Sequence, residues 1–387
     1  MRRSADRPLG VSPATVGDYR ELARRRLPRQ LFDYLDGGAY EEKTMRANVS
    51  DLERVLLRQR VMRDVSTRDQ TVEVLGRRLP FPVILGPVGL AGMYAARGEL
   101  KAARAAEAAG VPFVESTVSI CPLEEVARAS ATPPWFQLYV MRDRDFVGRL
   151  IDRAKAARCS ALVLTLDLQI LGQRHKDLKN GLSTPPKLTL ANIANMATKP
   201  RWCWAMLQTR RREFGNIVGH VAGIDDMSSL SEWTARQFDP KLSWDDVAWI
   251  KDRWGGKLVL KGIMDAEDAH RAVASGADAL IVSNHGGRQL DGAPSSIRAL
   301  PAVVGAVGRD IEVWMDGGIR SGQDVIRALA LGAKGTLIGR AFTYGLGAMG
   351  EAGVTKALEI IAKELDLTMA FCGLRDIADV DANILWR

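Results

Sequence analysis

The sequence predicts an α/β fold, a (β/α)8 TIM barrel with an N-terminal helical extension and a long insertion after the fourth strand. Short runs of continuous apolar residues recur along the chain, and such runs are typical of parallel strands covered on both faces. Amphipathic stretches separate most of them, which indicates right-handed helical crossovers. Eight such units favour a closed barrel over an open sheet. We interpret the 387 residues as one domain, because α/β barrels often exceed the usual single-domain length.

The expected strands and helices alternate in chain order. The eight expected strands are Phe81–Gly86, Pro112–Ser116, Trp135–Val140, Ala161–Asp167, Lys257–Lys261, Ala279–Ser283, Ile311–Asp316 and Gly335–Gly339. Expected helices between them include Glu99–Ala109, Asp145–Ala157, Ala266–Ser275 and Gln323–Leu331. We therefore assign the barrel, with its insertion, to residues 81–371.

Three segments lie outside this repeat. Residues 1–80 form the N-terminal extension, with helices expected at Val16–Arg26 and Arg29–Asp36. Residues 172–242 form the insertion, and residues 372–387 form a C-terminal tail. Connections longer than about 15 residues are usually functional lids or disordered segments, so the insertion is of functional interest.

The composition excludes several classes of protein. With 47% hydrophobic and 26% charged residues, the chain is typical of a globular protein. The four cysteines form no Cys-x-x-Cys pair and there are only four histidines, so we expect no metal site and reduced cysteines. The sequence has no apolar signal-peptide core and no apolar run of about 18 residues. We therefore expect a cytoplasmic protein without a transmembrane helix.

The most informative part of the chain is the signature segment, residues 283–292, which reads Ser-Asn-His-Gly-Gly-Arg-Gln-Leu-Asp-Gly and directly follows the apolar run Ala279–Val282. The C-terminal ends of barrel strands line the active site, so His285 and Arg288 can act there as a base and a cation for a small anionic substrate. A lone buried histidine is more often a satisfied hydrogen-bonding group. However, the other expected strands also end in polar residues or glycines. These are Gly89, Ser116, Gln137, Tyr139, Thr165, Asp167, Lys261, Asp316 and Gly339.

The last two units carry glycines and arginines where such barrels usually bind phosphate. The segments are Asp316–Gly322 and Gly332–Arg340. Glycines allow backbone N–H groups to approach a phosphate, and a helix N-terminus adds a favourable dipole. Arg320 and Arg340 can hold the anion by paired hydrogen bonds. Glycine pairs alone would indicate only tight turns, so the two arginines favour a phosphate site.

Lys261 ends the fifth expected strand as a buried cation. Beside a flavin it can stabilise negative charge on the reduced ring, because proteins tune the electronics of their cofactors. A Lys–Asp ion pair in the core is the alternative. A phosphate pocket next to histidine, arginine and tyrosine favours a phosphorylated cofactor and a carboxylate substrate.

These motifs resemble the active-site signature of the FMN-dependent α-hydroxy-acid dehydrogenases and oxidases. The resemblance covers nearly the whole chain and is strongest to the respiratory L-lactate dehydrogenases, which pass electrons to quinone. Its motifs are Phe32–Tyr34, Gly37–Ala39, Pro87–Leu90, Gly92–Tyr94, Trp135–Tyr139, Leu164–Asp167, Leu260–Gly262, the signature segment, Asp316–Gly318 and Gly339–Arg340. It implies an FMN cofactor, oxidation of an L-2-hydroxy acid, foremost L-lactate to pyruvate, and a homo-oligomer, with a tetramer favoured.

The resemblance also implies roles for individual residues. His285 is the catalytic base, and Asp167 pairs with the imidazolium and raises its basicity. His285 takes either the hydroxyl proton, with hydride transfer, or the Cα proton, which leaves a carbanion. Tyr34, Arg288 and Arg174 bind the substrate carboxylate, and Tyr139 hydrogen-bonds the hydroxyl or the developing carbonyl. The expected flavin contacts are Pro87, Val88, Gly89, Ser116, Gln137, Thr165, Lys261 and Ser283, and the expected phosphate contacts are Asp316, Gly317, Gly318, Arg320, Gly339 and Arg340.

Two departures from the family pattern bear on function. Leu168–Leu171 follows Asp167 where many members carry a proline, and Gly89 stands where glycolate-oxidase-like members usually carry alanine. The glycine favours a dehydrogenase. The alternatives are an oxidase that uses oxygen and releases hydrogen peroxide, and a flavin-binding scaffold without turnover. The complete set of catalytic residues disfavours the scaffold.

Residues 199–212 of the insertion interleave aromatic and basic residues. Two tryptophans, a methionine and a leucine lie among five cations, which is typical of an interfacial membrane segment. A solvated lid is the alternative. The net charge of +8 fits simple solubility, an anionic membrane or nucleic acid, but no nucleic-acid recognition motif is present. We expect peripheral contact with the inner face of the cell membrane, a quinone or other respiratory acceptor, and no nucleic-acid partner.

Overall fold

The computed structural model describes residues 13–181, 189–220 and 237–386. At its centre lie eight parallel strands in the order β3-β10-β9-β8-β7-β6-β5-β4, and a parallel bridge between Leu85 and Phe113 joins the two outer strands. The strands are β3 (Val83–Leu85), β4 (Val114–Ser116), β5 (Trp135–Tyr139), β6 (Leu162–Thr165), β7 (Leu258–Ile263), β8 (Ala279–Val282), β9 (Glu312–Asp316) and β10 (Gly335–Ile338). The predicted (β/α)8 barrel is confirmed.

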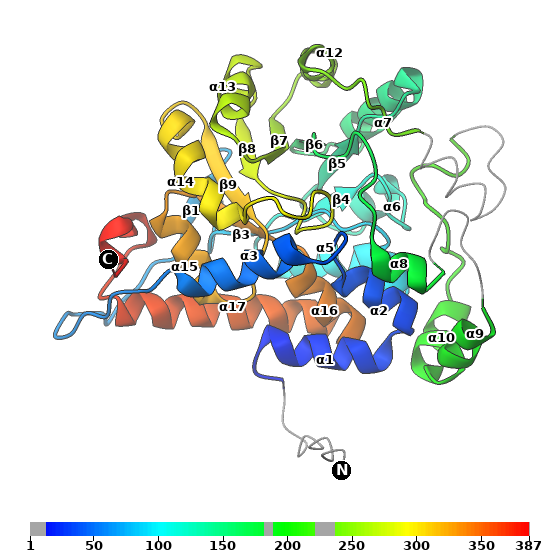
Figure 1. Cartoon of the computed structure of the whole chain (residues 1–387), viewed down its shortest axis with the longest axis horizontal. Coiled ribbons are helices and arrows are strands. Elements are labelled where there is room, and N and C mark those ends of the chain that lie inside the picture. Colours follow the sequence, from blue (N-terminus) through cyan, green and yellow to red (C-terminus); the bar gives the residue numbers. More distant parts are fainter. Residues whose placement is uncertain (1–12, 182–188, 221–236, 387) are drawn as a thin grey trace.

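Helices surround the barrel and run between its strands (Figure 1). After β3 to β10, in turn, come α5 (Gly98–Ala108), α6 (Leu123–Arg128), α7 (Arg144–Ala156), α12 (Trp244–Trp254), α13 (Ala266–Ala274), α14 (Ser296–Val307), α15 (Gly322–Ala330) and α16 (Arg340–Met349). Side chains that accept backbone N–H groups begin several of them, such as Asp143 for α7 and Ser321 for α15, because the first turn of a helix leaves its N–H groups unpaired. The long α17 (Glu351–Phe371) packs along α16, α15 and α5.

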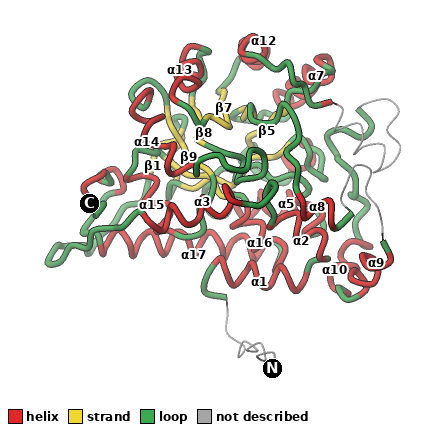
Figure 2. Tube along the Cα trace, viewed as in Figure 1, coloured by secondary structure: helices red, strands yellow, loops and turns green. Residues whose placement is uncertain are grey.

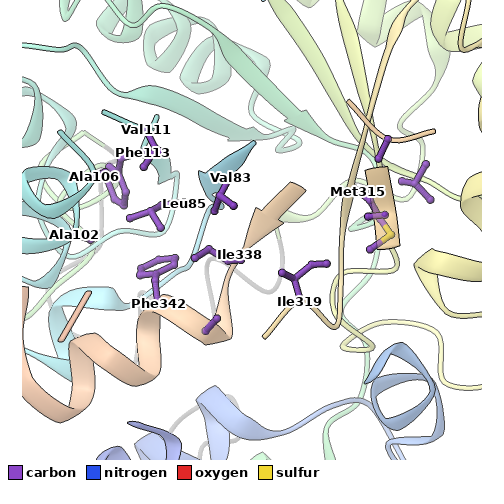
Figure 3. Packing of buried hydrophobic residues seen from close by; sticks show 14 of the residues in the cluster. Val83, Leu85, Ala102, Ala106, Val111, Phe113, Met315, Ile319, Ile338 and Phe342 are labelled. Atoms are coloured by element: carbon purple, nitrogen blue, oxygen red, sulfur yellow. The ribbon is translucent and has the colours of Figure 1, made fainter. Parts of the chain in front are cut away.

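The strands divide their side chains between two buried layers. One cluster receives a side chain from every barrel strand, so it fills the barrel interior. Trp135 and Trp314 stack within it, with ring centroids 5.5 Å apart. The other layer packs strands against helices, and Figure 3 shows Leu85 and Ile338 beside Phe342 of α16. Polar residues that lie at or just after several strand ends, such as Ser116, Thr165 and Ser283, belong to neither cluster and are available for chemistry.

A short hairpin that was not predicted lies in the extension. β1 (Val72–Val74) and β2 (Arg77–Leu79) pair antiparallel, and Leu75 and Gly76 make the turn with positive φ. Val74 and Leu79 are buried in the interior cluster, so the hairpin closes one end of the barrel. The extension is therefore not wholly helical. Three residues per strand are too few for a period of two to stand out in the sequence.

The extension and the insertion lie side by side. The extension contains the predicted helices α1 (Val16–Arg26) and α2 (Arg29–Asp36), and also α3 (Lys43–Arg54). The insertion contains α8 (His175–Lys179), α9 (Leu190–Ala197) and α10 (Pro200–Leu207), which lie at the periphery near α2 in Figures 1 and 2. Arg29 donates through its backbone N–H to Asn195 and through its side chain to Asn180. Among the helices of the described ranges, none is long and apolar enough to cross a membrane.

Candidate active site

The predicted base and its carboxylate partner meet at the C-terminal end of the barrel. Asp167 follows β6 and His285 follows β8, and His285 Nδ1 lies 2.9 Å from Asp167 Oδ1. The backbone of His285 is left-handed, with φ of 57°. Its N–H donates to Ser283 Oγ at 3.1 Å. Such a conformation is uncommon for a residue other than glycine, so neighbouring contacts must stabilise it.

The charges around Asp167 keep its carboxyl group ionised. Burial alone would raise the pKa of Asp167, but the charges of His285 and Lys261 and the hydrogen bond from His285 hold that pKa below its ordinary value. Asp167 Oδ2 is buried and has no hydrogen-bond partner within the part of the chain that the structure describes. A carboxylate in this position can orient the imidazole ring and stabilise its protonated form.

The segment after β6, whose sequence departs from the family pattern, is tied to the signature segment. Gln289 Nε2 donates to the carbonyl oxygens of Asp167 at 3.0 Å and Ile170 at 2.9 Å. Gly172 donates its N–H to Gln289 Oε1 at 3.2 Å. These hydrogen bonds hold residues 167–172 against the signature segment, and Arg174 follows directly and lies near the site.

Two arginines lie close to the ring of Tyr34, a residue of α2. Cζ of Arg288 lies 4.7 Å from the ring centroid, and Cζ of Arg174 lies 5.0 Å from it. Arg288 Nη1 donates to the carbonyls of Tyr34 at 2.7 Å and Gly37 at 2.9 Å. Within the described ranges these are the hydrogen bonds of Arg288, so its Nε–Nη2 edge is available. That edge matches a carboxylate in geometry and charge.

Tyr139 ends β5 next to the same group. Its ring meets Phe238 edge to face, with centroids 5.8 Å apart. Burial, assisted by the charge of Asp167, raises the pKa of Tyr139 above its ordinary value, so the hydroxyl keeps its proton and can donate. Phe238 was not predicted from the sequence, and neither was Asp177, which forms an ion pair with Arg174 at 2.5 Å. Both lie in or beside the insertion, where no strand pattern guided the assignment.

A row of buried polar side chains crosses three neighbouring strand ends. Ser116 Oγ donates to Gln137 Oε1 at 3.0 Å, and Gln137 Nε2 donates to Thr165 Oγ1 at 3.0 Å. Ser116 and Thr165 are the last residues of β4 and β6, and Gln137 lies two residues before the end of β5. Polar atoms held in a line on rigid strands suit a flat ring with donors and acceptors along its edge, such as a flavin.

Lys261 lies within β7, two residues before the strand ends, and not at its end as expected, and it is a member of an ion pair. Its Nζ donates to Ser283 Oγ at 3.1 Å and lies 3.4 Å from Asp316 Oδ2. Burial would lower the pKa of Lys261, but Asp316 and Asp167 raise it above its ordinary value, so the ammonium group stays charged. The Lys–Asp ion pair that was considered as an alternative to a flavin contact is therefore present, and Asp316 lies beside Lys261 and Ser283.

The ends of β9 and β10 combine glycines with two arginines. Gly317 and Gly318 have φ of 100° and 93°, which favours glycine. Gly339 precedes α16, and a Cβ on it would lie 3.7 Å from Val88, so the turn after β3 is adjacent. Arg320 stacks over the Tyr344 ring at 5.8 Å.

Arg340 is more constrained than the sequence indicated. Its Nε, Nη1 and Nη2 donate to the carbonyls of Leu35 at 3.1 Å, Gly286 at 2.9 Å and Gly37 at 2.7 Å. Burial and the nearby Arg288 and Arg320 lower the pKa of Arg340 to about 10. This excess of positive charge suits an anion, and two N–H bonds of the guanidinium lie beyond these three hydrogen bonds.

Gly89 lies close to Val118. A Cβ on Gly89 would lie 2.7 Å from Val118 Cγ2, so an alanine would require the valine to move. The residue that distinguishes this chain from glycolate-oxidase-like members therefore has a local steric role. Together, the polar row, Lys261, the buried Asp167 oxygen and the cluster of cations fit flavin mononucleotide.

Comparisons with known proteins agree with this arrangement. The model of the FMN-dependent dehydrogenase family matches residues 23–387. An L-lactate dehydrogenase of Caulobacter vibrioides (strain NA1000 / CB15N) is 52% identical over 373 residues, 96% of this chain and 97% of that protein. An L-lactate dehydrogenase of Stenotrophomonas maltophilia (strain R551-3) is 50% identical over 372 residues, 95% of this chain and 97% of that protein.

Solved structures show the same fold. The crystal structure of a monotopic membrane protein, (S)-mandelate dehydrogenase, superposes with a TM-score of 0.93 and 37% identity, covering 97% of this chain and 100% of that one. A mandelate oxidase superposes with a TM-score of 0.82 and 37% identity, covering 95% of this chain and 97% of that one. The match of the family model over nearly the whole chain establishes that this protein belongs to the FMN-dependent dehydrogenase family.

Proposed function

We propose that this protein oxidises an L-2-hydroxy acid, L-lactate to pyruvate, with FMN as its cofactor. The observation that carries the proposal is the His285–Asp167 pair beside Arg288, Arg174 and Tyr34. A base and a pair of cations next to each other suit a substrate that carries both a carboxylate and an ionisable α position. The relatives at 52% and 50% identity are named L-lactate dehydrogenases, which favours lactate.

Each side chain has a distinct task in the proposed reaction. The Nε–Nη2 edge of Arg288 binds the substrate carboxylate, with Arg174 and Tyr34 completing its environment. Tyr139 donates its hydroxyl proton to the substrate oxygen. His285 accepts a proton from the substrate, and the carboxylate of Asp167 stabilises the imidazolium that results.

FMN supplies the two-electron acceptor for this oxidation. Ser116, Gln137 and Thr165 would hold one side of its ring, and Pro87–Gly89 would lie beside it. Lys261 and Ser283 would contact the edge where negative charge develops on reduction. The remaining predicted contacts would surround the phosphate: Asp316, Gly317, Gly318, Arg320, Gly339 and Arg340. Because Asp316 pairs with Lys261, we expect it to act on the phosphate side only through that pair.

The decisive experiment is an anaerobic substrate panel. The purified protein should be yellow, and its flavin absorbance should bleach when L-lactate is added. Glycolate and L-mandelate test smaller and larger side chains, and D-lactate tests the handedness of the site. If none of the L-2-hydroxy acids reduces the flavin, the proposed chemistry is wrong.

We infer that the electrons pass to a quinone or another respiratory acceptor at the inner face of the cell membrane. An outward apolar face on α9 and α10 supports membrane contact, with Leu190, Ile193, Trp204 and Leu207 exposed. The related (S)-mandelate dehydrogenase is described as a monotopic membrane protein. Peroxide yield in air, measured against reduction of a quinone analogue, separates this function from an oxidase. Stoichiometric peroxide with no quinone reduction would favour the oxidase.

We also propose that the protein is a homo-oligomer, with a tetramer favoured by the family resemblance. Sedimentation equilibrium of the FMN-loaded protein measures its mass directly. A mass equal to one chain would refute this proposal and would leave the proposed chemistry unaffected.

A further inference from the structure

The left-handed conformation of His285 raises the question of what stabilises it. The residue lies between Asn284 and Gly286, and the next residue, Gly287, also has positive φ. Ser283 holds the N–H of His285, but that bond fixes only one end of the turn. Arg340 Nη1 donates to the carbonyl of Gly286, and the N–H of Ala39 donates to the carbonyl of Gly287. Further contacts come from α3, a helix of the N-terminal extension that has no part in the proposed chemistry.

Asn48 of α3 forms a reciprocal pair with Asn284. Asn48 Nδ2 donates to Asn284 Oδ1 at 2.8 Å, and Asn284 Nδ2 donates to Asn48 Oδ1 at 2.8 Å. Both side chains are buried. In a buried site, paired amides strongly restrict each other, because breaking the pair leaves donors and acceptors unpaired.

The pair is also bonded to backbone groups that follow His285 in the chain. Asn284 Oδ1 accepts the N–H of Gly287 at 3.1 Å, and Asn284 Nδ2 donates to the carbonyl of Pro294 at 3.0 Å. Asn48 Oδ1 accepts the N–H of Ser296 at 3.1 Å. The amide pair thus connects the beginning of the signature segment to Pro294 and Ser296, just beyond its end.

The same helix packs tightly against the turn after β9. A Cβ on Gly318 would lie 2.1 Å from the carbonyl oxygen of Asn48, and a Cβ on Gly317 would lie 3.4 Å from Asn48 Nδ2. A Cβ on Gly287 would lie 2.5 Å from the backbone nitrogen of Met45. The glycines at these positions therefore allow α3 to contact both the signature segment and the Gly317–Gly318 turn.

We propose that Asn48 is a positioning residue for His285, acting through Asn284. This inference rests on the proposed function only because it takes His285 as the base. Because Asn48 also contacts the Gly317–Gly318 turn, it connects the position of the base to the part of the site that we assign to the phosphate.

The test compares Asn48→Asp, Asn284→Ser and the double variant with the wild type. Asn48→Asp keeps the size of the side chain but removes the donor to Asn284 Oδ1. We expect FMN to remain bound and the anaerobic flavin reduction rate at saturating L-lactate to fall between about tenfold and about 100-fold, as for a misplaced catalytic group. The L-lactate concentration for half-maximal rate should change little, because Arg288 and Tyr34 are bonded elsewhere. The acid limb of the pH profile should move, because the His285–Asp167 geometry changes.

Non-additivity provides the specific signature of the pair. If Asn48 acts through Asn284, the double variant should be little slower than the slower single variant. Thr44→Val is the matched control, because Thr44 also lies on α3 and bonds the signature loop, but at Gly292 and Ala293. It should destabilise the protein without the same loss of rate. Wild-type rates in Asn48→Asp, additive losses in the double variant, or an equal rate loss in Thr44→Val would each overturn the proposal.

Hydrogen exchange of the backbone keeps this proposal separate from the proposed function. Asn48→Asp should speed exchange across residues 284–288, and Thr44→Val should speed it only around 291–293. If no 2-hydroxy acid reduces the wild-type flavin yet this difference appears, the proposed function fails and the positioning role stands. If Asn48→Asp does not load FMN, the uncharged Asn48→Ser variant takes its place. Unchanged exchange across 284–288 in that variant would also overturn the proposal.

Discussion

The signature segment after β8 and the insertion helices α9 and α10 after β6 differ in where their side chains find partners. In the signature segment, short polar side chains bond inward to the extension and to neighbouring strand ends, which fixes His285 and Arg288. In the insertion helices, Trp202 and Met206 face inward, whereas Trp204 and Leu207 are 66% and 69% exposed. A loop that must hold reacting atoms needs satisfied bonds, whereas an exposed apolar face needs a partner to cover it.

The cations of the two regions differ in the same way. Arg288 and Arg340 bond to carbonyls in the centre of the molecule. In the insertion, Arg211 pairs with Glu125 at 2.9 Å, and Lys199 donates to the carbonyl of Arg25. Some of the basic residues that suggested membrane attraction are therefore already paired. We therefore expect apolar contact to contribute more to the proposed membrane attachment than the count of basic residues alone suggested.

The largest expected effect comes from His285→Gln in the signature segment. FMN should remain bound, but flavin reduction by L-lactate should slow by at least about 100-fold, because the general base is lost. Stopped-flow absorbance under anaerobic conditions measures the rate. His270→Gln, at an exposed position on α13, is the matched control and should react normally. Near-normal reduction by His285→Gln would remove His285 from the mechanism.

Arg288→Lys tests whether the planar edge of the guanidinium binds the carboxylate. Loss of a charged hydrogen bond costs about 1.5–3 kcal/mol, so the KM for L-lactate should rise between about tenfold and about 100-fold. Steady-state kinetics with an artificial acceptor provide the measurement, and the exposed Arg309→Lys serves as control. An unchanged KM would mean that the carboxylate binds elsewhere.

A smaller effect is expected from the insertion helices. The double variant Trp204→Ser with Leu207→Ser should bind anionic phospholipid vesicles at least about tenfold more weakly, because two apolar side chains no longer bury in the interface. Flavin reduction by L-lactate should be unchanged. Co-sedimentation with vesicles measures binding, and Trp386→Ser, which removes an exposed tryptophan of the C-terminal tail, is the control. Equal binding by both variants would contradict the proposed attachment.

The smallest effect concerns Glu115, a buried residue of β4 that lies next to the insertion. Burial and the neighbouring Glu99 raise the pKa of Glu115 well above its ordinary value, and Asn216 of the insertion lies 3.5 Å away. The unfolded chain releases this proton at lower pH than the folded protein does, so stability falls as pH rises above about 4.3 towards the raised pKa.

Glu115→Gln does not titrate and should therefore be more stable than the wild type at pH 8, by about 2 °C in melting temperature. The difference should shrink towards pH 5. Thermal unfolding at the two pH values, with Glu73→Gln on the exposed hairpin as control, provides the measurement. A difference that grows as the pH falls would contradict the raised pKa.

Much of the fold was predictable because the period of apolar residues is a local property. Continuous apolar runs marked all eight barrel strands, and amphipathic segments marked α5, α7, α13 and α15. The hairpin and α3 were missed. The strands of the hairpin are short, and α3 carries its polar residues toward the protein, where Asn48 and Thr44 serve the signature segment.

The sequence by itself determined the barrel, the family and the residue types at the strand ends, because these depend on local patterns and motifs. Only the tertiary structure decided how distant segments combine. It joined His285 to Asp167, placed Arg288 and Arg174 over the ring of Tyr34, paired Lys261 with Asp316, and set Asn48 against Asn284. Such pairs form between residues far apart in the chain, and burial gives them their strength, so no local pattern fixes their geometry. The pairing of His285 with Asp167 was expected only from the family resemblance, and the Asn48–Asn284 pair was not expected at all.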